Sequence, residues 1–274
     1  MNHFEHNRNQ TFRVIRIGLI TAFFLLGFSC SVSTWQSILD DSQLSESEVI
    51  DGLKTALRVG TDKAVQLTSQ KDGYFRDEAI KILLPEEANN ALVALREAPG
   101  GEQLYQTAIA PRVDELIEAL NRSAENAAVQ ATPIFKNAIT QMTIGEAWDI
   151  LNENYQNAGN RSATTYFKNK TNDELKQLFQ PSIKQSLDKP LVQNVSANKI
   201  WNNFVKTYDA IANSPANLLM HIKPIQEPDL SMYVTTKALD GLFIKVADEE
   251  VKIRKDPYQY ASQILEKVFG KSTK

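Results

Sequence analysis

Apolar residues recur every three or four positions along most of this 274-residue chain. That spacing places them on one face of an α-helix, whereas a half-buried strand would alternate apolar and polar residues. Only residues 233–236 are locally favourable for a strand. The pattern therefore predicts an all-α protein, with helices over residues 45–60, 64–67, 85–96, 113–129, 143–151, 171–179, 191–212, 230–255 and 257–270.

Capping signals indicate where several of these helices begin and end. In a capping box, a Ser or Thr side chain accepts a hydrogen bond from the backbone N–H three residues on, and a Glu at that position bonds back. The pattern occurs at Ser45–Glu48, Thr143–Glu146 and Thr171–Glu174. Gly60 is predicted to end the first helix, and residues 74–84 to form a loop with apolar anchors. Short connections favour a single multi-helix domain with orthogonal or bundle-like packing.

The first thirty residues have a different pattern, which is typical of an export signal. Arg8, Arg13 and Arg16 precede an unbroken apolar run over residues 17–28. As a helix this run would be about 18 Å long, well short of the roughly 30 Å hydrocarbon core of a bilayer. Its length and its basic flank are those of a signal peptide, which is predicted to occupy residues 1–29.

Residues 26–30, Leu-Gly-Phe-Ser-Cys, resemble the lipobox of bacterial lipoproteins. The resemblance implies that Cys30 takes a diacylglycerol on its thiol, that cleavage occurs just before it, and that its new amino group is acylated, for example with palmitate. Ser31, rather than Asp, follows the cysteine, and in such lipoproteins this favours the outer membrane, with the body facing the periplasm. The alternatives are an ordinary cleaved signal with an incidental cysteine and a retained anchor helix.

The body of the chain lacks the residue patterns of most enzymes and nucleic-acid-binding proteins. The chain has 33 acidic and 30 basic residues, and removal of the basic leader leaves the mature body more acidic, which argues against nucleic acid. Cys30 is the only cysteine, so no thiol remains for a disulfide, a metal site or a nucleophile. His221, the only histidine outside the leader, lies in an apolar run, where a packing role is expected. The sequence therefore predicts no metal, no cofactor and no nucleic-acid partner.

Several blocks of sequence are specific in combination, although none is specific alone. They are Gly52–Leu57, Asp72–Phe75, Ile82–Pro85, Asn121–Ala128, Ala138–Thr143, Ala163–Phe167 and Val234–Phe243, the last followed by Glu249, Glu250 and Ile253–Pro257. Together they resemble the bacterial family called domain of unknown function 4197, over roughly residues 45–270. The resemblance implies an all-helical exported protein, and it implies no activity.

Charged residues interrupt the apolar face of the helix predicted over residues 230–255. Its apolar side chains cover an arc of about 200°, and Asp240, Glu250 and Arg254 lie within that arc. A buried charge is unfavourable unless it is paired. Glu250 and Arg254 are therefore expected to pair at i,i+4, and Asp240 to find another partner, such as Arg122, Lys237 or a capping amide. The three residues indicate either a buried ion-pair network or a functional polar pocket, unless the helix face is assigned wrongly.

The chain is thus predicted to contain a signal peptide over residues 1–29, a tether over residues 30–44 and a helical domain over residues 45–270. A firm anchor on a helical body without a catalytic motif favours a non-enzymatic envelope lipoprotein. Lipid on Cys30 would hold it at the membrane, where it would bind an envelope protein or lipid. The alternative is a carboxylate-dependent hydrolase or lyase of cell-wall glycan, suggested by Asp240 and Glu250. A structural lipoprotein that only oligomerises is a third hypothesis.

Overall fold

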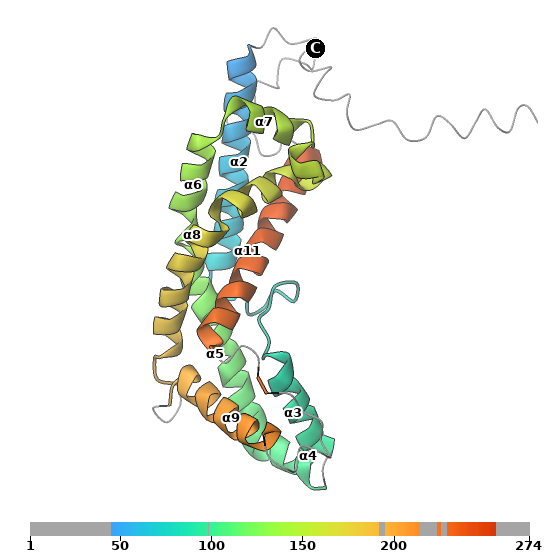
Figure 1. Ribbon diagram of the computed structural model, residues 1–274, viewed down its shortest axis with the longest axis vertical. Coiled ribbons are helices and arrows are strands. Elements are labelled where there is room, and N and C mark those ends of the chain that lie inside the picture. The colour runs from blue at the N-terminus through green and yellow to red at the C-terminus, as the bar shows by residue number, and fades with distance from the viewer. Residues whose placement is uncertain (1–44, 98, 192–194, 214–223, 226–228, 256–274) are drawn as a thin grey trace, which may run out of the picture. The chain divides into compact units, whose positions relative to one another are not determined.

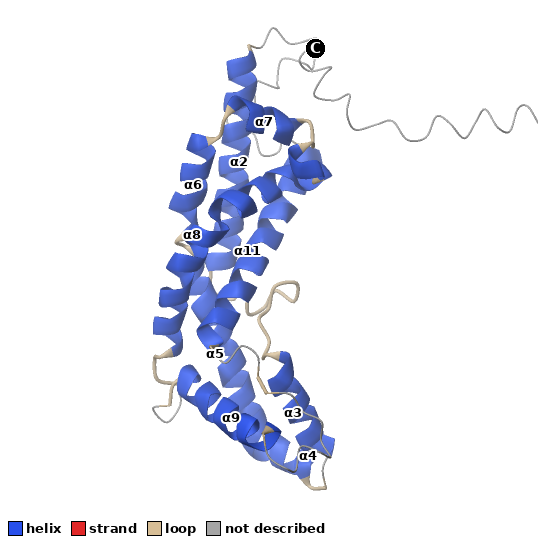
Figure 2. Cartoon of the chain, in the orientation of Figure 1, coloured by secondary structure: helices blue, strands red, loops and turns tan. Residues whose placement is uncertain are grey.

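A computed structural model of the chain confirms the all-α prediction. The structure describes residues 45–97, 99–191, 195–213, 224–225 and 229–255, most of which are helical (Figures 1 and 2). Among these residues, strand-like pairing is limited to an isolated bridge between Pro190 and Ser196. Residues 45–271 form one compact unit, which contains every helix named below. The leader, the tether, His221 and the helix predicted over residues 257–270 lie outside the described residues and remain predictions.

The order of the described helices agrees with the prediction in most places. The longer helices are α2 (Glu46–Ser69), α5 (Ala110–Ala128), α8 (Ser162–Leu187), α9 (Ala197–Ala212) and α11 (Leu230–Lys255). The shorter helices are α3 (Glu86–Glu97), α4 (Gly101–Leu104), α6 (Ala131–Gln141) and α7 (Ile144–Leu151). A π-helical turn, η1 (Tyr105–Ile109), joins α4 to α5, and two 3₁₀ turns, η2 (Tyr155–Asn157) and η3 (Gly159–Arg161), precede α8. The sequence pattern missed α6, and it placed the start of α9 at residue 191, before the actual start at Ala197.

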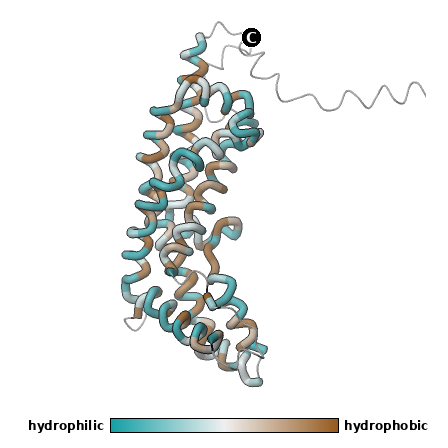
Figure 3. The backbone as a smooth tube through the Cα atoms, viewed as in Figure 1, coloured by the Kyte–Doolittle hydropathy of each residue, from teal (hydrophilic) through white to brown (hydrophobic). Residues whose placement is uncertain are grey.

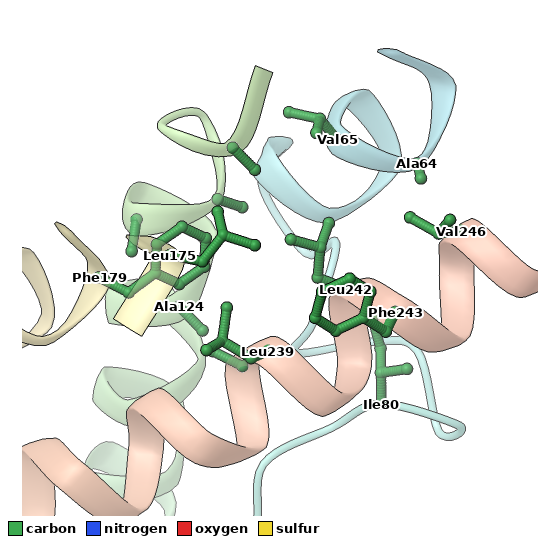
Figure 4. Packing of buried hydrophobic residues seen from close by; sticks show 14 of the residues in the cluster. Ala64, Val65, Ile80, Ala124, Leu175, Phe179, Leu239, Leu242, Phe243 and Val246 are labelled. Carbon is green, nitrogen blue, oxygen red and sulfur yellow. The ribbon is translucent and has the colours of Figure 1, made fainter. Parts of the chain in front are cut away.

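The hydrophobic core forms where α11 meets α2, α5 and α8. Figure 4 shows Leu239, Leu242, Phe243 and Val246 of α11 directed toward Ala64 and Val65 of α2, Ala124 of α5, and Leu175 and Phe179 of α8. Full burial of a Leu or Phe side chain is worth about 1.5–3 kcal/mol relative to exposure. The apolar faces of these four helices therefore supply the main stabilising contacts of the body.

The long helices are amphipathic, with apolar and polar segments alternating along each of them (Figure 3). Alternation of this kind is expected of helices that pack one face on a core and expose the other. No helix among the described residues combines the length and the apolar character that crossing a bilayer requires.

Two of the three predicted capping boxes are present. The backbone N–H of Ser45 donates to Glu48 Oε2 at 2.8 Å, and the N–H of Thr143 donates to Glu146 Oε2 at 2.9 Å. The third prediction is wrong, because Thr171 lies inside α8 and its hydroxyl donates to the carbonyl of Phe167 at 2.6 Å. A threonine within a helix commonly bonds to the carbonyl one turn earlier, so the motif alone does not identify a helix start.

Gly60 does not end the first helix, as the sequence suggested. Helix α2 continues through it to Ser69, so the short helix expected over residues 64–67 is part of α2. A Cβ atom at Gly60 would lie 2.9 Å from Ile253 Cδ1 of α11. The glycine therefore marks a close approach of two helices rather than a cap.

The loop over residues 70–84 confirms the prediction of apolar anchors. Tyr74 is fully buried, its hydroxyl donates to the carbonyl of Ala238 at 2.7 Å, and Ile80 and Ile82 are also buried. The loop packs so closely on α11 that a Cβ at Gly241 would lie 2.7 Å from Tyr74 Cε1 and 3.1 Å from Ile80 Cβ. Gly241 thus leaves the space that the loop occupies.

Replacement of two buried helical glycines, Gly241 and Gly60, is expected to have different effects. Gly241→Ala should lower the free energy of unfolding by about 1–2 kcal/mol, because the ring of Tyr74 and the Cβ of Ile80 cannot easily move away. Gly60→Ala is the matched control. It meets only the flexible end of Ile253 and gains about 1 kcal/mol of helix propensity, so stability should be unchanged or higher. Urea denaturation of both variants measures the difference, and equal effects would contradict the proposed packing.

Candidate functional site

Glu250, one of the predicted site residues, forms a cap on another helix. The residue is only 6 % exposed. Oε1 accepts a hydrogen bond from the backbone N–H of Ala163 at 2.9 Å, and Oε2 accepts bonds from the backbone N–H and the hydroxyl of Thr164, both at 2.7 Å. These amides belong to the first turn of α8, where a negative charge also interacts favourably with the helix dipole. Glu250 of α11 therefore fixes the start of α8.

Arg254 completes this arrangement by pairing with Glu250 along α11. Its Nη2 lies 2.7 Å from Glu250 Oε1, as the i,i+4 spacing predicted, and also donates to the carbonyl of Ile150 at 3.0 Å. Glu153 lies 3.8 Å from Nη1. The pair therefore connects α11 to the start of α8 and to α7. Its contacts are those of a structural network.

Asp240 does not join this network. It lies on α11 but is exposed, so the expectation that it faces the core is wrong. Around the helix axis, Asp240 lies outside the buried face of α11. The edges of such a wide apolar arc are hard to locate from the sequence. Arg122, one partner that the sequence suggested for Asp240, pairs instead with Asp72, Glu118 and Glu125.

Glu249 is a buried carboxylate that the sequence analysis did not single out. It is 1 % exposed, and its Oε1 lies 2.7 Å from Nζ of Lys252. Its Oε2 has no hydrogen-bond partner among the described residues. A buried oxygen without a partner costs about 1–3 kcal/mol. A Cβ atom at Gly60 of α2 would lie 3.8 Å from the Cβ of Glu249. A glycine at this position was therefore the signal in the sequence that α2 packs closely on this part of α11.

A third buried carboxylate, Glu125 of α5, holds the loop over residues 70–84. Its Oε1 accepts bonds from the backbone N–H groups of Tyr74 and Phe75, both at 3.1 Å. One turn earlier, the Asn121 side chain pairs with both backbone groups of Ile82, at 2.8 Å each. Neither residue was among the predicted site residues. The signal in the sequence was their polar character beside the apolar stripe of this helix.

Arg122 links Glu125 to the turn that opens the loop. It lies 2.6 Å from Asp72 and 2.8 Å from Glu125. The hydrogen bond from Arg122 holds the pKa of Asp72 below its usual value. Burial lowers the pKa of Arg122, but its bonds to Glu125 and Asp72 outweigh this and raise it overall. Burial, with a smaller contribution from Glu125, raises the pKa of Tyr74 well above its usual range. Asp72 and Arg122 therefore stay charged at neutral pH, and Tyr74 stays neutral.

A different environment lies between α3, α5 and α9, where the structure has an apolar pocket of about 160 Å³. Its lining consists of Leu84, Ala88, Leu92, Ile109, Arg112, Val113, Leu116, Ile200, Trp201 and Phe204. Arg112 is the one charged side chain among these. Figure 1 shows how α3 and α9 flank the first turns of α5, which form one wall of the pocket.

The backbone beside this pocket departs from regular helical geometry. At η1 the N–H of Ala110 bonds to the carbonyl of Tyr105, which is the i→i+5 pattern of a π-helix. Such turns are rare and occur frequently at functional sites. Ile109, the last residue of η1, lines the pocket. We therefore regard the pocket as the candidate functional site of the described body.

Metal binding has no candidate site in the part of the chain that the structure describes, since no three His, Cys, Asp or Glu side chains there are grouped to hold an ion. Asp240, Glu250 and Arg254 do not form a common site, because only the last two are in contact. Cys30 lies outside the described residues.

The chain belongs to the family described as "Protein of unknown function (DUF4197)", which matches residues 43–270. This match confirms the family resemblance drawn from the sequence blocks. No curated protein and no solved structure matches the chain significantly.

Removal of the Glu250 charge is expected to destabilise the protein strongly. Glu250→Gln leaves Arg254 without its charged partner and weakens the cap on α8, so the free energy of unfolding should fall by about 3 kcal/mol. Asp240→Asn, an equivalent change on an exposed part of the same helix, should alter it by less than about 0.5 kcal/mol. Denaturant unfolding of the two variants gives the comparison. Similar values for both would contradict the capping role of Glu250.

Proposed function

We propose that this member of the DUF4197 family is a lipoprotein of the bacterial cell envelope with a non-enzymatic, helical binding module. Its pocket between α3, α5 and α9 would receive an apolar group of another envelope component. The observation that carries the proposal is this pocket, whose walls are apolar apart from Arg112. The buried charges of Glu125 and Glu250, by contrast, are paired with backbone amides and arginines.

The size of the pocket supports binding of a small apolar group. An engineered apolar cavity of about 150 Å³ stays dry and binds benzene, which has six carbon atoms. The pocket here has a volume of about 160 Å³. At about 0.8 kcal/mol per methylene, burial of six carbons yields about 5 kcal/mol, which corresponds to a Kd no tighter than about 0.2 mM. The pocket is therefore suited to a ligand that is present at high local concentration.

A membrane tether would supply such a concentration for a ligand of the bilayer. One acyl chain holds a protein at a membrane only marginally, whereas two or three hold it firmly. The full modification of Cys30 that the lipobox implies therefore supports stable anchoring. Residues 30–44, fully extended, would reach about 45–50 Å. That reach allows the body to sample the membrane surface while it remains attached.

The alternative of a glycan hydrolase or lyase loses the residues that motivated it. Glycosidases need two carboxyl groups that flank the scissile bond at a separation of about 5–9.5 Å. Both Glu250 oxygens accept hydrogen bonds from α8, and Arg254 pairs with one of them. Asp240 is exposed elsewhere on the helix. These contacts favour the binding module over the enzyme.

The anchor is tested by analysis of the mature N-terminus. In bacterial cells that process lipoproteins, the N-terminal peptide should begin at Cys30 and carry the mass of a diacylglycerol and an amide-linked acyl chain. The protein should fractionate with the outer membrane. Cys30→Ser should abolish the lipid mass, because a hydroxyl does not replace the thiol in this modification. An unmodified N-terminus, or recovery of the wild-type protein from the cytosol, would refute the anchor.

The pocket is tested with a small apolar probe and two matched substitutions on α3. Residues 31–274 contain the whole compact unit and can be studied without lipid or detergent. Toluene at ten times its Kd should stabilise this chain by about 1.4 kcal/mol, a rise in Tm of about 3–6 °C. Ala88→Leu, which fills the pocket, should abolish the shift, and Ala94→Leu on the exposed face should preserve it. No shift in the wild type, or equal shifts in both variants, would refute the pocket as a binding site.

A further inference from the structure

We propose that the ligand of this pocket is a medium-chain alkyl carboxylate, that is, a single free fatty acid with its acid group at Arg112. This inference rests on the proposed function, since it concerns the same pocket between α3, α5 and α9. It adds the chemical class of the ligand and the residue that selects its headgroup.

The shape of the ligand follows from the walls and the volume of the pocket. Leu92 of α3, Val113 of α5 and Phe204 of α9 present apolar surface from three sides. The cavity of about 160 Å³ matches roughly six carbon atoms. One alkyl segment of that length fills it, whereas the paired chains of a phospholipid do not fit. The occupant is therefore a single chain.

The headgroup follows from Arg112, the one charged side chain of the lining. Its Nη1 donates to Glu115 Oε2 at 3.0 Å, and the side chain is 38 % exposed. A guanidinium has five N–H donors arranged as a planar fork, and a carboxylate can accept two of them side by side. Glu115 accepts the one hydrogen bond described for Arg112. Donors therefore remain for an acid group at the rim of the pocket.

Arg112 also discriminates between headgroups on the same alkyl chain. An alcohol would bury the same carbons but would gain no charged hydrogen bond, and an amine would be repelled by the guanidinium. The formal net charge of the chain is −3, which opposes an anion at long range. Charges farther away than about 8 Å are largely screened at physiological ionic strength, so the groups beside the ligand decide. The Arg112 guanidinium attracts an acid group, and the Glu115 carboxylate, 3.0 Å from it, partly offsets this attraction.

A matched pair of probes tests the headgroup preference. Isothermal titration of residues 31–274 with octanoate and with octanol should give a Kd about five-fold lower for octanoate. This factor is modest because a charged hydrogen bond at a partly exposed site is weaker than a buried one. Octylamine should bind more weakly than octanol. Equal affinities for octanoate and octanol would overturn this inference and leave the proposed function standing, whereas no binding of either probe would overturn both.

Substitutions identify Arg112 as the source of the preference. Arg112→Gln should raise the Kd of octanoate to that of octanol and leave octanol unchanged, and Glu115→Gln should lower the Kd of octanoate further. Arg96→Gln, which removes an arginine outside the pocket lining, should preserve the preference. If Arg112→Gln abolishes binding of both probes by disturbing the fold, Arg112→Lys decides. A retained preference for octanoate supports the inference, and its loss overturns it.

Discussion

The fold depends on buried carboxylates that pair with backbone amides belonging to other elements. The first N–H groups of a helix, and those of a buried loop, have no partner in their own element, and leaving them unpaired is costly. Glu250 pairs with the first turn of α8, and Glu125 pairs with the N–H groups of Tyr74 and Phe75. An arginine on the same helix, Arg254 or Arg122, partners each carboxylate. These contacts define where the core helices begin and how the loop packs on them.

Helix α11 is constrained from several sides as a result. Glu250 and Arg254 position it against the start of α8 and the end of α7, and Gly241 admits the buried loop that Glu125 holds. Its apolar residues then meet α2, α5 and α8 in the core (Figure 4).

Much of the fold could be predicted because its signals are local. The periodicity predicted the start of α11 at Leu230, and the capping boxes predicted the starts of α2 and α7. The errors occurred where one local motif can serve more than one role. Gly60 resembles a helix stop but accommodates Ile253, and Thr171 resembles a cap but bonds within α8. The pocket was not predictable, because its lining residues lie on separate helices and the sequence pattern does not show which helices pack together.

The separation of charge and apolar surface explains why a binding role suits this body. Its buried charges stabilise the body near α7, α8 and the loop, whereas the pocket near η1 has apolar walls and one rim charge. A pocket of this size is limited to weak binding by the area that it buries. The proposed lipid anchor on Cys30 would give the body an effective concentration in the millimolar range at the membrane, as short linkers do. A Kd of about 0.2 mM would therefore suffice for a ligand of the membrane, and tighter binding would hinder its release.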